Sequence, residues 1–325
     1  MDAIIIAHGD LDGMTAAAIT IAYLQYNYNL EKYELLFSQP FNLHETLRKI
    51  FQRATDMTFI IDIALDEEHW PHIKKELLDL IGKTKIIWID HHRSTIQHVV
   101  ELLEMNIPLL ASIDGCAATI VGEAFLEKIG DKEFFSKLVV IGEVSDKVKS
   151  IPNTHPLKPI IEVLGNALSE NPTDDDFKRK LVRTWLKEKT LVTDEAARRS
   201  EEAVERLKAL LKEASENIIY DTEKLRIIDL RNTRVHGYAG KIASHHANSY
   251  KKITLLLFRV GEVNTIVTAR VPENIKLDIA SILKNLAEKY GGGGGGHPRA
   301  ASARVPSTMA DEFVRELAKK IESSI

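Results

Sequence analysis

The sequence predicts an α/β protein in which a parallel-sheet domain is joined by a long helix to a smaller α/β domain. Three observations lead to this prediction. The first half alternates short apolar runs with helix-like stretches, a rhythm typical of a doubly wound sheet. A long, mostly polar stretch with one apolar face follows at 194–215. Strand-like and helix-like segments then resume and continue to the end.

Four apolar runs in the first half are predicted strands. Two of them, 58–64 (TFIIDIA) and 85–90 (KIIWID), are continuously apolar until they reach an aspartate. Such strands are typical of a parallel sheet that helices cover on both faces. The predicted strands are 3–8, 33–37, 58–64 and 85–90, and the predicted helices are 14–26, 67–80, 116–128 and 134–144.

The long helix predicted at 194–215 divides the chain. Asp194 and Glu195 stand in its first turn, where the helix dipole favours acids. We therefore predict a catalytic domain over 1–190, a connector helix over 191–217 and a substrate-binding domain over 218–325. In the last of these we expect strands at 225–230, 252–258 and 264–270, and helices at 237–250, 277–290 and 309–324.

Composition narrows the class of protein. The chain has 325 residues, of which 44% are hydrophobic and 28% charged, as in globular proteins. No apolar run approaches the roughly 20 residues of a membrane span, and the first residues lack the basic region of a signal peptide. The single cysteine, Cys116, excludes an intramolecular disulfide and a cysteine-based zinc cage. It fits a reducing compartment, so we expect a cytoplasmic protein without a membrane partner.

The net charge of −4 is divided unevenly. Residues 218–325 hold 17 Lys and Arg against 11 Asp and Glu, which is +6, so the rest of the chain carries −10. Ordinary solvated surface charge is one explanation. The other is an acidic catalytic half and a basic half that contacts a polyanion.

Acids and histidines follow the predicted strands at three places and a predicted helix at a fourth. Any one of them alone is more often a turn former or a helix cap than a ligand. The carboxyl ends of parallel strands meet at one edge of a sheet, however, and ligands bind there. The four motifs are HGDLDG at 8–13, FIID ending at Asp62, IDHH at 89–92 and GEVSD ending at Asp146.

Several carboxylates at one edge would raise one another's pKa and cost stability unless a cation is bound between them. Carboxylates and imidazoles without cysteine suit Mn²⁺ or Mg²⁺. One shared carboxylate can bridge two ions roughly 3.5–4 Å apart, the arrangement of two-metal phosphoester hydrolysis.

These four motifs, in this order, resemble those of the DHH phosphoesterases. That group includes RecJ-type single-strand exonucleases, nanoRNases, cyclic-dinucleotide phosphodiesterases and family II inorganic pyrophosphatases. Near the end of the chain, GGGGGGHPRAASARVP resembles the glycine-rich signature of the DHH-associated domain. The motifs are most similar to those of archaeal RecJ-like nucleases, and the resemblance leaves only 150–217 without a motif.

The resemblance implies a two-metal site in which Asp62 bridges the ions and a water between them is the nucleophile. Asp90 is implied to orient His91, and His92 to face the substrate phosphate. The implied ligands are His8, Asp10 and Asp62 for one ion and Asp12, Asp62, His91 and Asp146 for the other.

The glycine run at 291–296 has two interpretations. It is a flexible tether, or it is a loop in which φ > 0 exposes backbone N–H groups to an anion. The second explains the adjacent His-Pro-Arg and the position inside a domain, and we prefer it. The candidate substrate-binding residues are Gly294, Gly295, Gly296, His297, Arg270, Arg299 and Arg304.

We therefore predict a metal-dependent hydrolase. It would be a RecJ-like exonuclease that degrades single-stranded DNA or RNA to nucleoside monophosphates with two divalent cations, Mn²⁺ or alternatively Mg²⁺. A nanoRNase or a cyclic-dinucleotide phosphodiesterase shares every motif. A non-catalytic replication or repair adaptor is a further alternative, and a helicase or similar protein is a possible partner. The sequence leaves open the polarity of degradation, DNA against RNA, substrate length, oligomeric state and the physiological partner.

Overall fold

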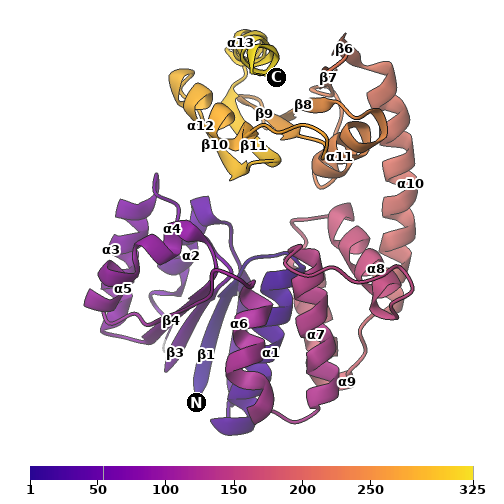
Figure 1. The fold of residues 1–325 in the computed structure, drawn as a ribbon. Helices are drawn as coiled ribbons and strands as arrows, with labels where there is room; N and C mark the ends of the chain where they lie inside the picture. The colour runs from indigo at the N-terminus through magenta and orange to yellow at the C-terminus, as the bar shows by residue number, and fades with distance from the viewer. Residues whose placement is uncertain (54, 325) are drawn as a thin grey trace. The chain divides into compact units, whose positions relative to one another are not determined.

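The computed structural model describes residues 1–53 and 55–324. The chain forms two compact units, Met1–Ser200 and Glu201–Ile325, each built on its own sheet (Figure 1). The division falls inside helix α10 (Asp194–Glu216), so the helix contributes to both units. The boundaries that we placed at 190 and 217 stay predictions.

The first unit contains the predicted parallel sheet. Its strands follow the order β2-β1-β3-β4-β5, and every neighbouring pair is parallel. The last strand was not predicted, because three residues are too few to show a pattern. The strands are β1 (Asp2–Ala7), β2 (Lys32–Phe37), β3 (Met57–Ile61), β4 (Lys85–Asp90) and β5 (Leu109–Ala111).

Helices cover both faces of this sheet (Figure 1). One face packs against α2 (Leu43–Ile50), α3 (Trp70–Ile81) and α5 (Val99–Glu104), and short α4 (Arg93–Gln97) precedes α5. The other face packs against α1 (Leu11–Asn27), which is rich in alanine because further helices pack on its outer side. Those helices are α6 (Ala117–Phe125), α7 (Lys132–Ser145) and α9 (Asp175–Glu188), and α8 (Leu157–Glu170) completes the layer.

The second unit is α/β with a mixed sheet in the order β10-β11-β9-β8-β7-β6. Only β7 and β8 are parallel; the other neighbours are antiparallel. Helix α11 (Ala239–Tyr250) covers one face, and α12 (Ile279–Lys289) and α13 (Ala310–Ser323) cover the other. The strands are β6 (Ile218–Asp221), β7 (Leu225–Asp229), β8 (Ile253–Val260), β9 (Asn264–Arg270), β10 (Gly293–His297) and β11 (Ala300–Pro306). The predicted fold class is therefore confirmed.

The glycine run is a strand rather than the loop that we expected. Residues from Gly293 onward form β10, the edge strand of the sheet, and pair with β11. Within the run only Gly291 and Gly296 have positive φ, at 70° and 135°. The pairing explains the difference, because β11 supplies hydrogen bonds that give an extended conformation to residues with little strand preference of their own.

None of the helices in the described ranges is both long enough and apolar enough to span a membrane.

Candidate metal centre

Three adjacent strands of the first unit bring acids and histidines to one edge of the sheet. β1, β3 and β4 are neighbours and parallel, and they end at Ala7, Ile61 and Asp90. The residues that follow are His8, Asp10 and Asp12 after β1, Asp62 after β3, and His91 and His92 after β4. Asp146 joins them from the C-terminus of α7.

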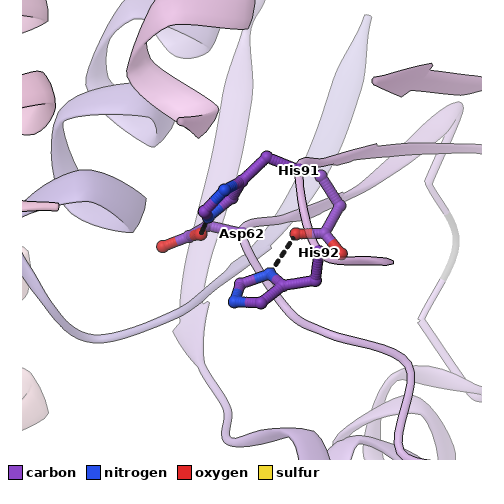
Figure 2. Close-up of side chains that lie close together, drawn as sticks. Asp62, His91 and His92 are labelled. Atoms are coloured by element: carbon purple, nitrogen blue, oxygen red, sulfur yellow. Dashed lines mark hydrogen bonds and ion pairs between the residues drawn. The ribbon is translucent and has the colours of Figure 1, made fainter. Parts of the chain in front are cut away.

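The buried carboxylate of Asp62 lies at the centre of the cluster. Its Oδ1 is 3.4 Å from His91 Nε2, and its Oδ2 is 3.8 Å from His8 Nδ1. Figure 2 shows the imidazole of His91 directed at Asp62. Asp62 has a φ of 59°, which is uncommon outside glycine, and its N–H donates to the Ile89 carbonyl at 2.8 Å. This backbone turn points the carboxylate between the two histidines.

His8 and Asp10 form a hydrogen-bonded pair beside Asp62. Their Nδ1 and Oδ2 atoms are 3.0 Å apart. The Gly13 N–H donates to the other oxygen of Asp10 at 3.0 Å, so Asp10 also caps α1. The second nitrogen of His8 is 3.2 Å from Oε1 of Gln39. The sequence analysis did not single out Gln39, because a lone neutral side chain carries no recognisable pattern.

Asp12 is buried and caps a different helix. The backbone N–H groups of Ala117 and Ala118, at the start of α6, donate to its two oxygens at 2.8 Å each. Each carboxylate oxygen has further acceptor capacity, so capping leaves room for a cation. Burial raises the pKa of the nearby Cys116 thiol to about 12, and the charge of Asp12 adds to the effect. The thiol therefore stays protonated, and its Sγ lies 3.5 Å from the Thr119 hydroxyl oxygen.

Two glycines allow the elements of the centre to approach this closely. A Cβ on Gly13 would lie 2.4 Å from the His8 carbonyl oxygen and 3.1 Å from Asp62 Oδ2. A Cβ on Gly142 of α7 would lie 2.4 Å from the Ala118 Cβ and 2.9 Å from Asp12 Oδ1. All four distances are below ordinary van der Waals contact, so larger residues would displace the helices that hold the acids.

The potential ligand atoms fall into three groups, each with all its atoms within 4.8 Å of one another. Asp62 belongs to two of the groups, and His91 Nε2 lies 3.9 Å from Asp146 Oδ2 of the third. The groups are Asp62 with Asp90, His91 and His92; His8 with Asp10 and Asp62; and Asp12 with Cys116 and Asp146.

The electrostatics of the cluster favour a bound cation. Burial raises the pKa of Asp62 well above its ordinary value, and the charges of Asp10 and Asp12 raise it further. Burial likewise raises the pKa of Asp12 to about 7. The pKa of Asp10 moves the other way, because the charge and hydrogen bond of His8 outweigh its desolvation. Oxygen and imidazole donors with this much uncompensated negative charge fit Mn²⁺ or Mg²⁺.

The resemblance implied that Asp90 orients His91. In the structure Asp90 is hydrogen-bonded to His92 instead. His92 Nδ1 is 2.7 Å from Asp90 Oδ1, and the Thr95 hydroxyl donates to Asp90 Oδ2. Thr95 in turn accepts from the Leu65 N–H at 2.8 Å. Asp90 and Thr95 are fully buried, whereas 41% of the His92 side chain is exposed. Asp90 and Thr95 thus fix the His92 ring through Nδ1, and Nε2 takes no part in the hydrogen bond with Asp90.

The candidate substrate residues all lie in the second unit, but they do not form one cluster. Arg270 and His297 both align with Ala300 across the sheet, and Arg299 donates to the Val271 carbonyl close by. These three basic residues lie at one end of the sheet. Arg304 is four residues farther along β11, roughly 13 Å away. Gly294, Gly295 and Gly296 lie on edge strand β10 between them.

Comparisons with known proteins support a family assignment. The family model of the DHHA1 domain matches residues 230–323. No curated protein matches the sequence.

Three solved structures share the fold along nearly the whole chain. The DHH domain of a protein described as a member of a family of ribosomal proteins is 19% identical, with a TM-score of 0.75 over 98% of this chain and 86% of that one. The pGpG-specific phosphodiesterase PggH of Vibrio cholerae is 12% identical, with a TM-score of 0.59 over 99% of both chains. RecJ of Thermus thermophilus with Mn²⁺ is 15% identical, with a TM-score of 0.58 over 97% of this chain, which spans about half (51%) of that RecJ chain.

These likenesses show that the chain shares its fold with a phosphodiesterase and with a RecJ exonuclease. Residues 230–323 match the DHHA1 domain, as the glycine-rich motif predicted, and the chain as a whole shares the fold of a DHH domain and of RecJ.

Proposed function

We propose that the protein is a divalent-metal-dependent phosphodiesterase that degrades single-stranded DNA or RNA to nucleoside monophosphates. The observation that carries the proposal is Asp62, a buried carboxylate shared by two groups of potential ligands at the edge of the parallel sheet. Two such groups joined by one carboxylate are what two-metal phosphoester hydrolysis requires.

Two cations would have seven ligands in six residues. When bound, they would activate a water near neutral pH and neutralise charge on the phosphate. RecJ of Thermus thermophilus has been solved with Mn²⁺ and with Mg²⁺, which supports the use of either ion here. The residues would be His8, Asp10 and Asp62 for one cation and Asp12, Asp62, His91 and Asp146 for the other.

The residues of the chain also bind and position the phosphate in this proposal. Asp90 accepts from His92 Nδ1, which leaves Nε2 as the donor toward a phosphate oxygen or the leaving oxygen. Desolvation lowers the pKa of His92, but the hydrogen bond and charge of Asp90 outweigh it and the pKa is raised. The raised pKa extends the protonated form of His92 to higher pH, which suits a donor to an anion.

The second unit supports nucleic acid as the substrate. Its net charge is positive from 218 onward, and the desolvated Arg270 has a lowered pKa and no acidic partner within the described residues. The glycine edge strand offers backbone N–H groups that β11 does not use. Together they would contact the phosphates of a single strand.

A dinucleotide is the second candidate substrate. The match to the pGpG-specific phosphodiesterase covers 99% of both chains, whereas RecJ has about twice the length of this chain. CDC45 of Entamoeba histolytica also shares the fold, with a TM-score of 0.55, which supports a replication or repair partner as a further proposal.

Digestion of labelled oligonucleotides separates the two substrates. With Mn²⁺, we expect 5′-labelled and 3′-labelled single strands of DNA or RNA to be degraded processively to monophosphates, with a rate that does not fall as length rises above a dinucleotide. A rate that falls steeply with length would favour the dinucleotide candidate. Absence of hydrolysis of any phosphodiester, with metal bound, would contradict both and leave an adaptor.

The edge strand gives a specific prediction, because its glycines differ in how much space surrounds them. A Cβ at Gly295 would meet no atom within 4 Å, whereas a Cβ at Gly292 would lie 2.0 Å from the Arg304 carbonyl oxygen. We expect Gly295→Val to keep stability within about 0.5 kcal/mol and to raise KM for oligonucleotides, because bulk would block the close approach of the strand. Gly292→Ala should instead lower the melting temperature. Unchanged KM in Gly295→Val would remove this strand from the substrate surface.

A further inference from the structure

The second unit contains a hollow whose lining residues have no part in the proposed function. Its volume is about 530 Å³, and it opens between the β6–β7 turn, the end of α11 and the segment after β9. Lys224, Lys251 and Lys276 line it, together with the aromatic ring of Tyr250. Among the described residues of its lining, Glu223 is the single acidic side chain against three lysines.

The three lysines have no salt bridge in the part of the chain that the structure describes, 1–53 and 55–324, although many other lysines of the protein do. All three are exposed. Neighbouring Lys252, by contrast, is paired with Asp221 at 2.9 Å. The charge at the hollow is therefore available to an anionic ligand.

Tyr250 is held rigidly although nearly half of it, 48%, is exposed. The guanidinium of Arg226 lies 3.8 Å over its ring, and the buried His246 stacks against it with ring centroids 5.6 Å apart. Arg226 is itself fixed by Asp221, to which it donates at 2.9 and 3.2 Å. His246 thus supports the Tyr250 ring from one side. A fixed, half-exposed ring bordered by cations is suited to stacking with a nucleobase.

The position of the hollow connects it to the basic end of the same sheet. At this end of the sheet the paired residues run across four strands. They are Thr254 of β8, Arg270 of β9, Ala300 of β11 and His297 of β10. The hollow lies beyond this end, next to the first residues of β7 and β8. From β10 to β7 there are four strand spacings of about 4.8 Å, roughly 19 Å in all. One strand of nucleic acid several nucleotides long can cover that distance, and a dinucleotide cannot.

We propose that this hollow is a second nucleic-acid site, in which a base stacks on Tyr250 and the adjacent phosphates contact Lys224, Lys251 and Lys276. The proposal rests on the proposed function and extends it, because the hollow would favour long single strands over dinucleotides. Asn274 lines the same hollow; its Nδ2 donates to the Lys251 carbonyl at 3.4 Å, so its amide oxygen would be the acceptor for a hydrogen bond from the base.

Binding without hydrolysis provides the test. The full chain in EDTA is titrated with a fluorescent single strand of about twelve nucleotides, a length within the range that single-strand sites occupy. We expect Tyr250→Leu to weaken binding by about 5- to 140-fold, and Tyr250→Phe to bind nearly as well as the wild type. The triple variant K224S/K251S/K276S should lower the slope of log affinity against log salt by about 2.

A charge-matched control removes three other lysines of the same unit. K212S/K284S/K319S changes the net charge equally at exposed positions outside the hollow. Its salt slope should stay close to that of the wild type. If both triple variants change the slope equally, or if Tyr250→Leu binds like Tyr250→Phe, the hollow is not a nucleic-acid site. If either of these results is found while the wild type still hydrolyses oligonucleotides, only the proposal of a second site is refuted. If the wild type has no affinity for single strands, the proposed function is refuted as well.

Discussion

Asp62→Asn is expected to abolish hydrolysis and the binding of both divalent cations while the fold stays intact. The carboxylate is the one residue common to two groups of potential ligands, so its loss affects both cations. We expect metal affinity to fall by more than the roughly 10- to 100-fold typical of changes to the partners of metal ligands. Asparagine is preferred to alanine, because it tolerates the φ of 59° at this position.

Metal content and stability are measured on the same preparation. Asp62→Ala should show the same loss of metal and activity, with an added cost to the backbone. In EDTA at pH 8, Asp62→Asn should melt at a higher temperature than the wild type. A raised pKa means that the charged form of Asp62 is disfavoured in the folded state, so stability falls as pH rises through the ordinary carboxyl pKa toward the raised one. The neutral amide removes this penalty.

The exposed Asp79, substituted by Asn, serves as the control and should leave metal content unchanged. Activity in Asp62→Asn at the wild-type rate would refute the two-metal proposal.

The sequence was sufficient for the main elements and for the edge at which the candidate site lies. Continuous apolar runs such as 58–64 and 85–90 end in aspartates, and parallel strands place those ends side by side. This is why Asp62 and His91, 29 positions apart, could be assigned to one place before their distance of 3.4 Å was known. The fold class followed from the same motifs and is confirmed, and the DHHA1 domain is confirmed at 230–323.

The partners within the site could not be predicted from the motif alone. Side chains alternate along an extended backbone, so Asp90 and His92, two residues apart, lie on the same side and His91 on the other. Thr95 and Gln39 are neutral residues that belong to no sequence motif. Only the fold brings Thr95 to Asp90 and Gln39 to His8. The strand formed by the glycines likewise depends on pairing with β11, a long-range contact that local composition does not encode.

His92→Ala is expected to lower kcat by about 100- to 10,000-fold, the usual contribution of a positioned proton donor, with metal content close to that of the wild type. Its ring is fixed through Nδ1 by the buried Asp90, whereas the adjacent His91, with ring centroids 4.3 Å apart, is directed at Asp62 (Figure 2). Loss of both metal and activity would instead make His92 a ligand. The exposed His72, changed to Ala, is the matched control and should keep the wild-type rate.

Asp90→Asn tests how the His92 donor is held, and its readout is the pH profile. Asp90 raises the pKa of His92, so in the wild type the protonated donor persists to higher pH and activity falls as pH rises through that raised pKa. Without the carboxylate charge the pKa of His92 drops, and the alkaline limb of kcat should move to lower pH. We expect kcat at neutral pH to fall by about 10- to 150-fold, the value of one charge-assisted hydrogen bond. Thr95→Val should weaken the same arrangement to a smaller extent, because it removes only the hydroxyl that donates to Asp90. A lower kcat with an unshifted alkaline limb would mean that Asp90 acts on the fold of the site and not on the proton of His92.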